Sequence, residues 1–330
     1  MNRARVFSSL DGLPPLGGRL HVAVGMFDGV HRGHRLVIEA AVEAARREGG
    51  CAGVFTFWPH PSRLFRPEDP TRLIFGAEER RELLEAVGAG FVVEQPFTAE
   101  FARWEAESLV GRLRAAMPGL RALYVGENWR FGRARRGDVS LLVELARREG
   151  VDVVSLDRVH VNGDAVSSTR IRGLLMDGAL PEANALLGFP YYCRGRVVPG
   201  RQLGRTIGVP TLNLDWTPDL APAFGVYAVR VANDDGGAAS LPAVANFGVR
   251  PTVDGSGAPV LEVHVLGACP FGRGDALRVE WHARIRGERR FESIDALRAR
   301  IEEDRREAST YLASPDSGYV AKESDDGVDA

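Results

Sequence analysis

The first half of the chain alternates short apolar runs with stretches whose apolar residues recur at helical spacing. Apolar runs of strand length occupy residues 21–25 and 51–57, and the amphipathic stretch 33–48 lies between them. The alternation predicts a doubly wound parallel sheet with helices on both faces, whose ligand site lies at the carboxyl ends of the strands. Further strands are expected at 91–93, 122–126 and 151–156, and further helices at 77–87, 99–117 and 139–149.

The pattern changes after about residue 188. Short alternating segments there are separated by Gly, Pro, Asn and Asp, which is typical of an antiparallel barrel or sandwich. A closing helix is expected after the N-cap candidate Ser293, with Ile294, Leu297 and Ile301 on its apolar face. We therefore expect an α/β domain over 1–187, an antiparallel β-barrel domain with this helix over 188–313, and a disordered tail over 314–330. The expected barrel strands are 194–198, 225–231, 243–247, 260–266 and 277–285.

Composition restricts the class of protein. With 330 residues, 45% hydrophobic and 26% charged, the chain has the size and balance of about two folded domains. Its formal net charge of −2 argues against a nucleic-acid or membrane partner, so neither is expected. The three cysteines lie far apart and residues 1–20 hold no long apolar run, which indicates a cytoplasmic protein. A monomer or a weak homo-oligomer is expected.

Lysine is almost absent from the sequence. The only lysine is Lys322, near the end of the chain. P-loop proteins, protein kinases and Schiff-base enzymes need a lysine within a folded domain, so the sequence excludes these classes. Any phosphate must then be bound by arginine, histidine or main-chain N–H groups.

A turn with two histidines joins the first expected strand to the first expected helix. This histidine turn reads Gly25-Met26-Phe27-Asp28-Gly29-Val30-His31-Arg32-Gly33-His34, and its two histidines share a face of the helix. The helix N-terminus offers N–H groups and partial positive charge, and the glycines allow a ligand to approach closely. We interpret the turn as a polyphosphate site in which imidazoles stabilise a leaving pyrophosphate. A metal site or a capped turn is the alternative, although two histidines alone make a poor zinc site.

Two other segments are candidates for ligand contact. Ser167-Ser168-Thr169-Arg170-Ile171-Arg172 begins a helix, where hydroxyl side chains are ordinary N-caps. Its two arginines suit phosphate oxygens, so we expect the second side of a nucleoside-triphosphate site. The loop Gly126-Glu127-Asn128-Trp129-Arg130-Phe131-Gly132 leaves a strand end, and it is either a solvated loop or a ligand contact.

The second domain gives weaker signals. A stretch rich in Gly and Arg, which includes Gly204 and Arg205, leads to Thr211 and Asn213 on an extended segment. Its N–H groups suit phosphate and its side-chain oxygens suit Mg²⁺, although a barrel corner is the simpler explanation from the residues alone. Glu262 lies in an apolar strand: pointing inward it is a candidate base, and pointing outward it is an ordinary surface residue.

In order and spacing, several of these segments resemble the prokaryotic bifunctional FAD synthetases (riboflavin kinase/FMN adenylyltransferase). The histidine turn, Thr56-Phe57-Trp58-Pro59-His60-Pro61, and residues 126–132 and 167–172 resemble the adenylyltransferase module of that family. Residues 195–213, 225–227 and 246–252, together with Glu262 and the final helix, resemble its riboflavin kinase module. The resemblance covers nearly all of residues 22–312.

The resemblance implies roles for single residues. His31 and His34 match the family's phosphate-binding His-x-Gly-His, and Arg172 matches the arginine of its Ser-Ser-Thr-x-x-Arg signature. Thr211 and Asn213 are expected to hold Mg²⁺ and ATP phosphate, and Glu262 to be the base. Stacking on a flavin is suggested for Phe57, Trp129 and Phe131 by location only. Positions expected to bind nucleotide or flavin are Gly25, Phe27, Asp28, Gly33, Asn128, Ser168, Thr169, Gly204 and Arg205.

The implied function is two consecutive phosphate transfers in FAD biosynthesis. One ATP phosphorylates riboflavin to FMN, and a second ATP adenylylates FMN to FAD and releases pyrophosphate, with Mg²⁺ as the metal. One alternative is a nucleotidyltransferase for another phosphate ester, joined to a non-catalytic flavin-binding barrel. The other is a non-catalytic flavin-binding or regulatory protein that contacts RNA through residues 130–136, which the slight net acidity disfavours.

Overall fold

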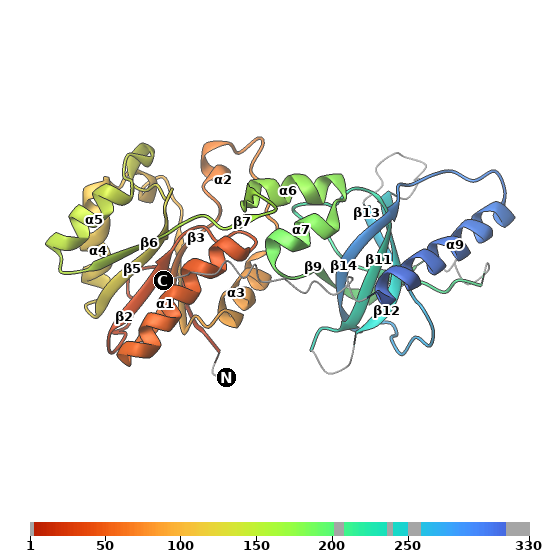
Figure 1. Ribbon diagram of the computed structural model, residues 1–330, viewed down its shortest axis with the longest axis horizontal. Helices are drawn as coiled ribbons and strands as arrows, with labels where there is room; N and C mark the ends of the chain where they lie inside the picture. Colours follow the sequence, from red (N-terminus) through yellow and green to blue (C-terminus); the bar gives the residue numbers. More distant parts are fainter. Residues whose placement is uncertain (1–2, 201–207, 236–239, 250–258, 315–330) are drawn as a thin grey trace, which may run out of the picture. The chain divides into compact units, whose positions relative to one another are not determined.

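Two separately folded parts make up the chain. A computed structural model describes residues 3–200, 208–235, 240–249 and 259–314. The chain divides into two compact units, Met1–Ser168 and Thr169–Ala330, and each is built around its own sheet (Figure 1). The domain bounds expected from the sequence, which divide the chain at residue 187, stay a prediction. The expected tail lies outside the described residues from residue 315 onward.

The first unit contains a six-stranded parallel sheet with the strand order β1-β4-β3-β2-β5-β6. The central strands are almost continuous runs of buried apolar residues, as a sheet covered on both faces requires. The expected parallel sheet is confirmed, and β1 is a strand that the sequence pattern missed. The strands are β1 (Arg5–Phe7), β2 (Leu20–Val24), β3 (Cys51–Trp58), β4 (Phe91–Pro96), β5 (Leu120–Gly126) and β6 (Asp152–Leu156).

Helices connect the strands of this sheet. The first helix ends where its sequence predicts, because Gly49 takes a left-handed conformation (φ 63°) and its N–H bonds back to the carbonyls of Ala45 and Arg46. The helices are α1 (Arg32–Glu48), α2 (Ser62–Phe65), α3 (Ala77–Ala86), α4 (Leu109–Ala116) and α5 (Val139–Arg148). Short elements are the 3-10 turns η1 (Phe101–Arg103), η2 (Ala106–Ser108) and η3 (Arg133–Arg135) and the strand pair β7 (His160–Val161) and β8 (Asp164–Ala165).

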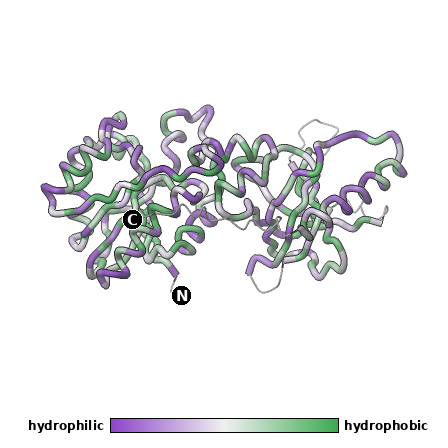
Figure 2. The backbone as a smooth tube through the Cα atoms, viewed as in Figure 1, coloured by the Kyte–Doolittle hydropathy of each residue, from purple (hydrophilic) through white to green (hydrophobic). Residues whose placement is uncertain are grey.

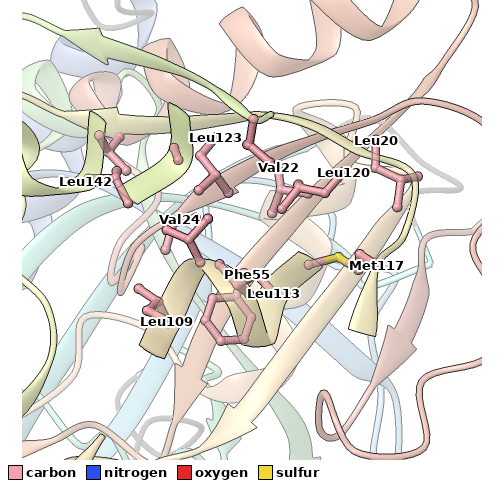
Figure 3. Close-up of a cluster of buried hydrophobic side chains, with 14 of the residues drawn as sticks. Leu20, Val22, Val24, Phe55, Leu109, Leu113, Met117, Leu120, Leu123 and Leu142 are labelled. Atoms are coloured by element: carbon pink, nitrogen blue, oxygen red, sulfur yellow. The ribbon is translucent and has the colours of Figure 1, made fainter. Parts of the chain in front are cut away.

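Apolar clusters lie on both faces of the sheet. On one face, Val22 and Val24 of β2 belong to a cluster that includes Leu113 of α4 and Leu142 of α5 (Figure 3). On the other face, Ala23 of β2 belongs to a cluster with residues of α1 and α3. Because successive strand residues point to opposite faces, one strand contributes to both clusters. The sheet is therefore covered by helices on both sides, as expected.

One expected helix is wrong. Residues 99–117 form η1, η2 and α4 instead of a single helix. At Trp104 the backbone leaves the helical region (ψ 122°), and the Trp104 carbonyl accepts a hydrogen bond from the N–H of Arg133 at 2.8 Å. A carbonyl inside an α-helix would accept from the N–H four residues later. Residue spacing gave no sign of the break, since Arg133 lies far along the chain.

The second unit contains a closed antiparallel barrel with the strand order β10-β13-β12-β11-β14-β9. Its strands are β9 (Tyr191–Val198), β10 (Leu212–Leu214), β11 (Gly225–Asn233), β12 (Leu241–Val249), β13 (Pro259–Val265) and β14 (Ala276–Arg286). Along β13, buried Leu261, Val263 and Val265 alternate with half-buried Glu262 and His264, which is the pattern of a strand with one face in a barrel interior. Of the two expected architectures, the barrel is therefore the correct one.

Helices α6 (Ser168–Asp177) and α7 (Leu180–Leu187) precede the barrel, and α9 (Ile294–Ala313) follows it. The Asn184 side chain of α7 donates to the carbonyl of Trp281 and accepts from the N–H of Tyr191, which fixes α7 to the barrel. The expected N-cap of α9 is confirmed, since the Ser293 hydroxyl accepts from the N–H of Ala296 at 3.1 Å.

The apolar face expected for α9 is only partly correct. Ile294 is 64% exposed, and the buried apolar residues that pack on the barrel are Ala308 and Leu312 near the other end of the helix. Buried Asp304 also faces the barrel, where Arg286 of β14 donates to it at 2.8 Å. The helix is therefore held on the barrel by an ion pair as well as by apolar contacts. Much of α9 is hydrophilic, as its purple colour in Figure 2 shows. None of the described helices is long and apolar enough to cross a membrane.

Candidate functional site

The histidine turn leaves the sheet at the point where the strand order reverses. Strand β2 lies between β3 and β5, so the chain moves from β2 to β3 on one side and later returns to β5 on the other. Open parallel sheets bind their ligands at the carboxyl ends of the strands beside such a switch point. The loop after β5, which contains Asn128, leaves the sheet at the same edge.

His31 and His34 are brought together at the start of α1. His31 is the N-cap, and its Nδ1 accepts a hydrogen bond from the N–H of His34 at 3.3 Å. The two imidazoles stack with their centroids 3.6 Å apart, and the ring of Phe27 meets His34 edge-on at 5.3 Å. Both imidazoles therefore lie at a helix N-terminus, where N–H groups and the helix dipole favour an anion. Within the part of the chain that the structure describes, no group of three or more His, Cys, Asp or Glu side chains is placed to hold a metal ion.

The glycines of the turn have different roles. A Cβ on Gly25 would lie 3.0 Å from the Phe27 ring, so the chain itself disfavours a side chain there. Gly29 has a left-handed backbone (φ 86°) that favours glycine. At Gly33, by contrast, a Cβ would meet only the His31 ring at an ordinary 3.4 Å. Since the fold leaves room for a side chain at Gly33, a glycine there suits the approach of a ligand to the helix N-terminus.

Asp28 holds the turn in place. Its carboxylate is buried and accepts a hydrogen bond from the N–H of Ile74 at 3.1 Å. Its main-chain carbonyl accepts from the hydroxyl of Ser168 at 2.9 Å. Ser168 thus brings the start of the second predicted motif to the histidine turn. Thr169 and Arg172, whose side chains lie 3.5 Å apart in α6, belong to the second unit, so their place in the site stays a prediction.

The loop after β5 combines an exposed Asn128 with arginines that are already paired. Trp129 stacks on buried Phe131 with centroids 4.8 Å apart. Three of the four arginines in residues 130–136 form ion pairs with acidic residues of the same unit, which favours a solvated loop over a surface for RNA. These pairs are Arg130–Asp138, Arg133–Glu105 and Arg136–Glu107.

An aromatic cluster that the sequence analysis largely missed lies beside the ends of β3 and β4. Phe57 contacts Phe101 with centroids 5.3 Å apart, and Phe97 contacts both of them. Phe65 is 65% exposed and meets Phe97 edge-on at 5.8 Å, so the cluster reaches the surface. Only Phe57 was expected from the sequence, because the other rings come from separate short elements and connections, α2, η1 and the residues after β4 and η1, that only the fold brings together. The cluster consists of Phe57, Phe65, Phe97, Phe101 and Trp104.

In the barrel, strand register aligns three polar residues. Glu262 of β13 pairs with Asn213 of β10 on one side and with Asn246 of β12 on the other. Paired residues share a face of a sheet, and this face is the outer one, since the neighbours of Glu262 on β13 are buried inside. The asparagine–glutamate row thus lies on the outside of the barrel. The sequence placed Asn246 in the expected strand 243–247 without a role of its own, and only the register shows that it lies beside Glu262.

A cavity of about 180 Å³ opens beside this row. Asn213 is only 7% exposed and lines it, together with residues of the adjoining strands and of the segment after β10. Thr211 directly precedes β10. Gly204 and Arg205 lie outside the described residues. The cavity is lined by Val198, Pro199, Asn213, Leu214, Asp215, Trp216, Thr217, Pro259 and Val260.

Comparisons with known proteins match both parts of the chain to families. The family model described as FAD synthetase matches residues 17–170, and the one described as riboflavin kinase matches residues 187–312. The "Bifunctional riboflavin kinase/FMN adenylyltransferase" of Escherichia coli (strain K12) is 38% identical over 292 residues, which cover 88% of this chain and 92% of that protein. The chain belongs to this family. The family, the fold class and the bifunctional enzyme expected from the sequence are confirmed.

Other relatives extend the comparison. The family member of the same name from Bacillus subtilis (strain 168) is 32% identical over 298 residues, covering 89% of this chain and 92% of its own. The solved structure titled "Crystal Structure of Macrolide-efflux Protein from Streptococcus pneumoniae" has a TM-score of 0.84 and 29% identity, covering 93% of this chain and 99% of that one. Its title describes that protein in other terms, whereas both family models and the curated relatives agree on flavin chemistry.

Proposed function

We propose that the first unit transfers the adenylyl group of ATP to FMN and that the barrel unit transfers the γ-phosphoryl group of ATP to riboflavin. The first assignment depends on one observation, the stacked His31 and His34 at the N-terminus of α1. The second is supported by the asparagine–glutamate row beside the cavity. The two family matches fall on the corresponding parts of the chain.

In the adenylyl transfer, a phosphate oxygen of FMN attacks the α-phosphorus of ATP. The bond from that phosphorus to the oxygen bridging to the β-phosphorus breaks, and pyrophosphate leaves. The nucleophile is already an anion, so this unit needs no strong base. His31, His34 and the N–H groups of α1 donate to the charge that develops on the pyrophosphate. Arg172 and Thr169 of α6 bind the same phosphates in this proposal, and Asn128 contacts the nucleotide or the flavin.

The aromatic cluster is the proposed surface for the flavin ring. Aromatic side chains stack well on planar ligands, and the exposed edge of Phe65 is accessible to one. Phe131, suggested from the sequence, is buried against Trp129 and suits a supporting role better than direct stacking.

In the phosphoryl transfer, Glu262 takes the proton of the riboflavin 5′-hydroxyl while that oxygen attacks the γ-phosphorus of ATP. The bond from the γ-phosphorus to the β–γ bridging oxygen breaks, and ADP leaves. Asn213 and Asn246 are the cross-strand neighbours of Glu262, and in this proposal their amides orient its carboxylate. Glu262 points outward, the direction that the residues alone attribute to an ordinary surface glutamate, so the role of base is supported by its place in the asparagine–glutamate row beside the cavity and not by burial.

Thr211 and Asn213 are the proposed protein ligands of Mg²⁺ in the kinase site. Mg²⁺ prefers oxygen ligands and usually binds one or two protein groups together with water and phosphate, which fits a hydroxyl and a buried amide beside a cavity. An ion held by these two residues would supply positive charge that offsets the charge of the ATP phosphates. Gly204 and Arg205 complete the phosphate site in this proposal.

One product assay tests both assignments. The protein is incubated with riboflavin and MgATP, and the flavins are separated by chromatography. Formation of FMN followed by FAD is expected. Unchanged riboflavin would contradict the proposal and favour a flavin-binding protein. A second incubation starts from FMN, and failure to form FAD from it would favour a nucleotidyltransferase for another phosphate ester.

The setting in which the enzyme works is also proposed. The three cysteines are free thiols, which suits the reducing cytoplasm. A formal net charge of −2 gives no basis for binding nucleic acid or an anionic membrane. A monomer or weak homo-oligomer is proposed, and light scattering during size-exclusion chromatography measures it directly.

A further inference from the structure

The histidine turn contains strained backbone. Phe27 and Val30 take φ values of 51° and 40°, in the left-handed region that favours glycine. A β-branched residue such as valine adopts this region only rarely. Strained backbone persists where surrounding groups determine its conformation, and it is common at sites that must be organised before a ligand binds. The contacts that hold this turn therefore decide how well its histidines are placed.

Arg80 makes one of these contacts from the neighbouring helix α3. Its Nη1 donates to the carbonyl of Met26, inside the turn, at 3.4 Å and to the carbonyl of Phe57, near the end of β3, at 3.2 Å. The hydroxyl of Thr56 donates to the same Met26 carbonyl at 3.2 Å. One guanidinium thus joins the turn after β2 to the carboxyl end of β3.

Arg80 is itself held from several sides. It is only 3% exposed, and its Nη2 donates to Oε1 of buried Glu94 on β4 at 2.7 Å. Glu94 is fixed in turn by Arg81, whose Nε donates to Oε2 at 2.8 Å. The Arg80 guanidinium also lies over the ring of Trp58, 5.0 Å from its centroid. A side chain held in this way is a rigid support for the backbone that it contacts.

We propose that Arg80 is a positioning residue for adenylyl transfer: with Glu94 it fixes the Met26 carbonyl and, through the turn, the placement of His31 and His34. This inference rests on the function proposed for the first unit. If Arg80 served only to stabilise the fold through an ion pair, the contact with Glu94 would be enough. Arg80 also donates hydrogen bonds to two main-chain carbonyls, which the several N–H groups of its planar guanidinium make possible.

The test uses the full chain and both of its reactions. Arg80→Met is expected to lower kcat for FMN adenylylation by about 10²-fold, because a displacement of about 1 Å at a reacting group costs that much. The KM values for FMN and ATP should change little, and riboflavin phosphorylation by the same preparation should be unchanged. A kcat close to that of the wild type would overturn the proposal.

Leu113→Ala is the matched control for stability. Leu113 is fully buried in the cluster on the face of the sheet that packs against α4 and α5, so its truncation weakens the unit without touching the turn. Assayed well below its unfolding temperature, this variant should keep the wild-type kcat. An equal loss of kcat in both variants would show that stability alone explains the effect of Arg80.

Arg80→Lys keeps the test decisive if Arg80→Met does not fold. Lysine retains a charge for Glu94 but lacks the fork, so kcat is expected to fall by about tenfold with a normal melting temperature. An unchanged kcat in Arg80→Lys contradicts the positioning role. His34→Ala separates this inference from the proposed function. If His34→Ala keeps adenylyl transfer, the proposed histidine site is wrong. If His34→Ala loses adenylyl transfer but the Arg80 variants keep it, only the role of Arg80 is wrong.

Discussion

The two candidate sites are assembled in opposite ways. In the first unit, His31 and His34 lie in one continuous turn, and distant side chains such as Arg80 and Ser168 hold its backbone. In the barrel, Asn213, Glu262 and Asn246 come from separate strands, and the hydrogen-bond register of the sheet alone aligns them.

This difference predicts how each site fails. A turn keeps its chemical groups together whatever happens elsewhere, but their placement is lost when a supporting contact is removed. A row across strands needs no such supports, but a slip of one residue along β13 would turn Glu262 into the barrel interior. Substitutions in each unit therefore test a different kind of construction.

The largest effect is expected for Glu262→Gln. Glutamine keeps the size of the side chain but cannot take the hydroxyl proton, so riboflavin phosphorylation should fall by about 10²- to 10⁴-fold. The rate is measured as FMN formed from riboflavin and MgATP. Adenylylation of added FMN serves as the control and should be unchanged. Full kinase activity in the variant would remove Glu262 as the base.

A somewhat smaller effect is expected for His34→Ala. The variant loses one donor to the leaving pyrophosphate but keeps His31 and the N–H groups of α1, and losing one such donor typically costs about 10²- to 10³-fold in kcat. Pyrophosphate release from FMN and ATP measures this loss, while riboflavin phosphorylation should stay normal. If both reactions fell equally, the two sites would not be separate.

The same contrast explains which features the sequence could predict. The histidine turn was found because its residues are contiguous and lie between an apolar run and an amphipathic helix. The asparagine–glutamate row could not be found in this way, because Asn246 and Glu262 become neighbours only through the pairing of β12 with β13. Likewise the helix expected over 99–117 is broken by the bond between Trp104 and Arg133, a contact between distant residues that no local spacing records.

Asn246→Ala tests the row itself, and its expected effect is smaller. Asn246 is the cross-strand neighbour of Glu262, and the loss of one neutral polar contact is worth about 0.5–1.5 kcal/mol, so kinase activity should decrease by about twofold to tenfold. Adenylylation of added FMN by the same preparation should be unchanged. Unchanged kinase activity would show that register alone does not make Asn246 part of the site.

The smallest effect concerns the other end of β2, away from the histidine turn. His21 is 1% exposed, with its Nδ1 2.9 Å from the hydroxyl of Tyr124 and its Nε2 3.6 Å from the Glu48 carboxylate. Burial lowers the pKa of His21 below its usual value of 6.5; Glu48 opposes this shift, and Arg121 and Arg19 add to it. The fold therefore favours the neutral form of the His21 imidazole.

Because the pKa of His21 is lower in the folded state, the unfolded chain binds the proton more readily. The stability that this difference contributes is complete above the unfolded pKa and is lost as the pH falls below it toward the folded pKa. The urea midpoint of the first unit should thus decrease more between about pH 7.5 and about pH 5.5 in the wild type than in His21→Gln, which cannot titrate. The corresponding difference in the free energy of unfolding should stay below the ~2–5 kcal/mol that the truncation of a core leucine costs. At neutral pH, His21→Gln should catalyse both reactions at the wild-type rates, since no reacting group contacts His21. If the urea midpoints of the two proteins depended equally on pH, protonation of His21 would not contribute to stability.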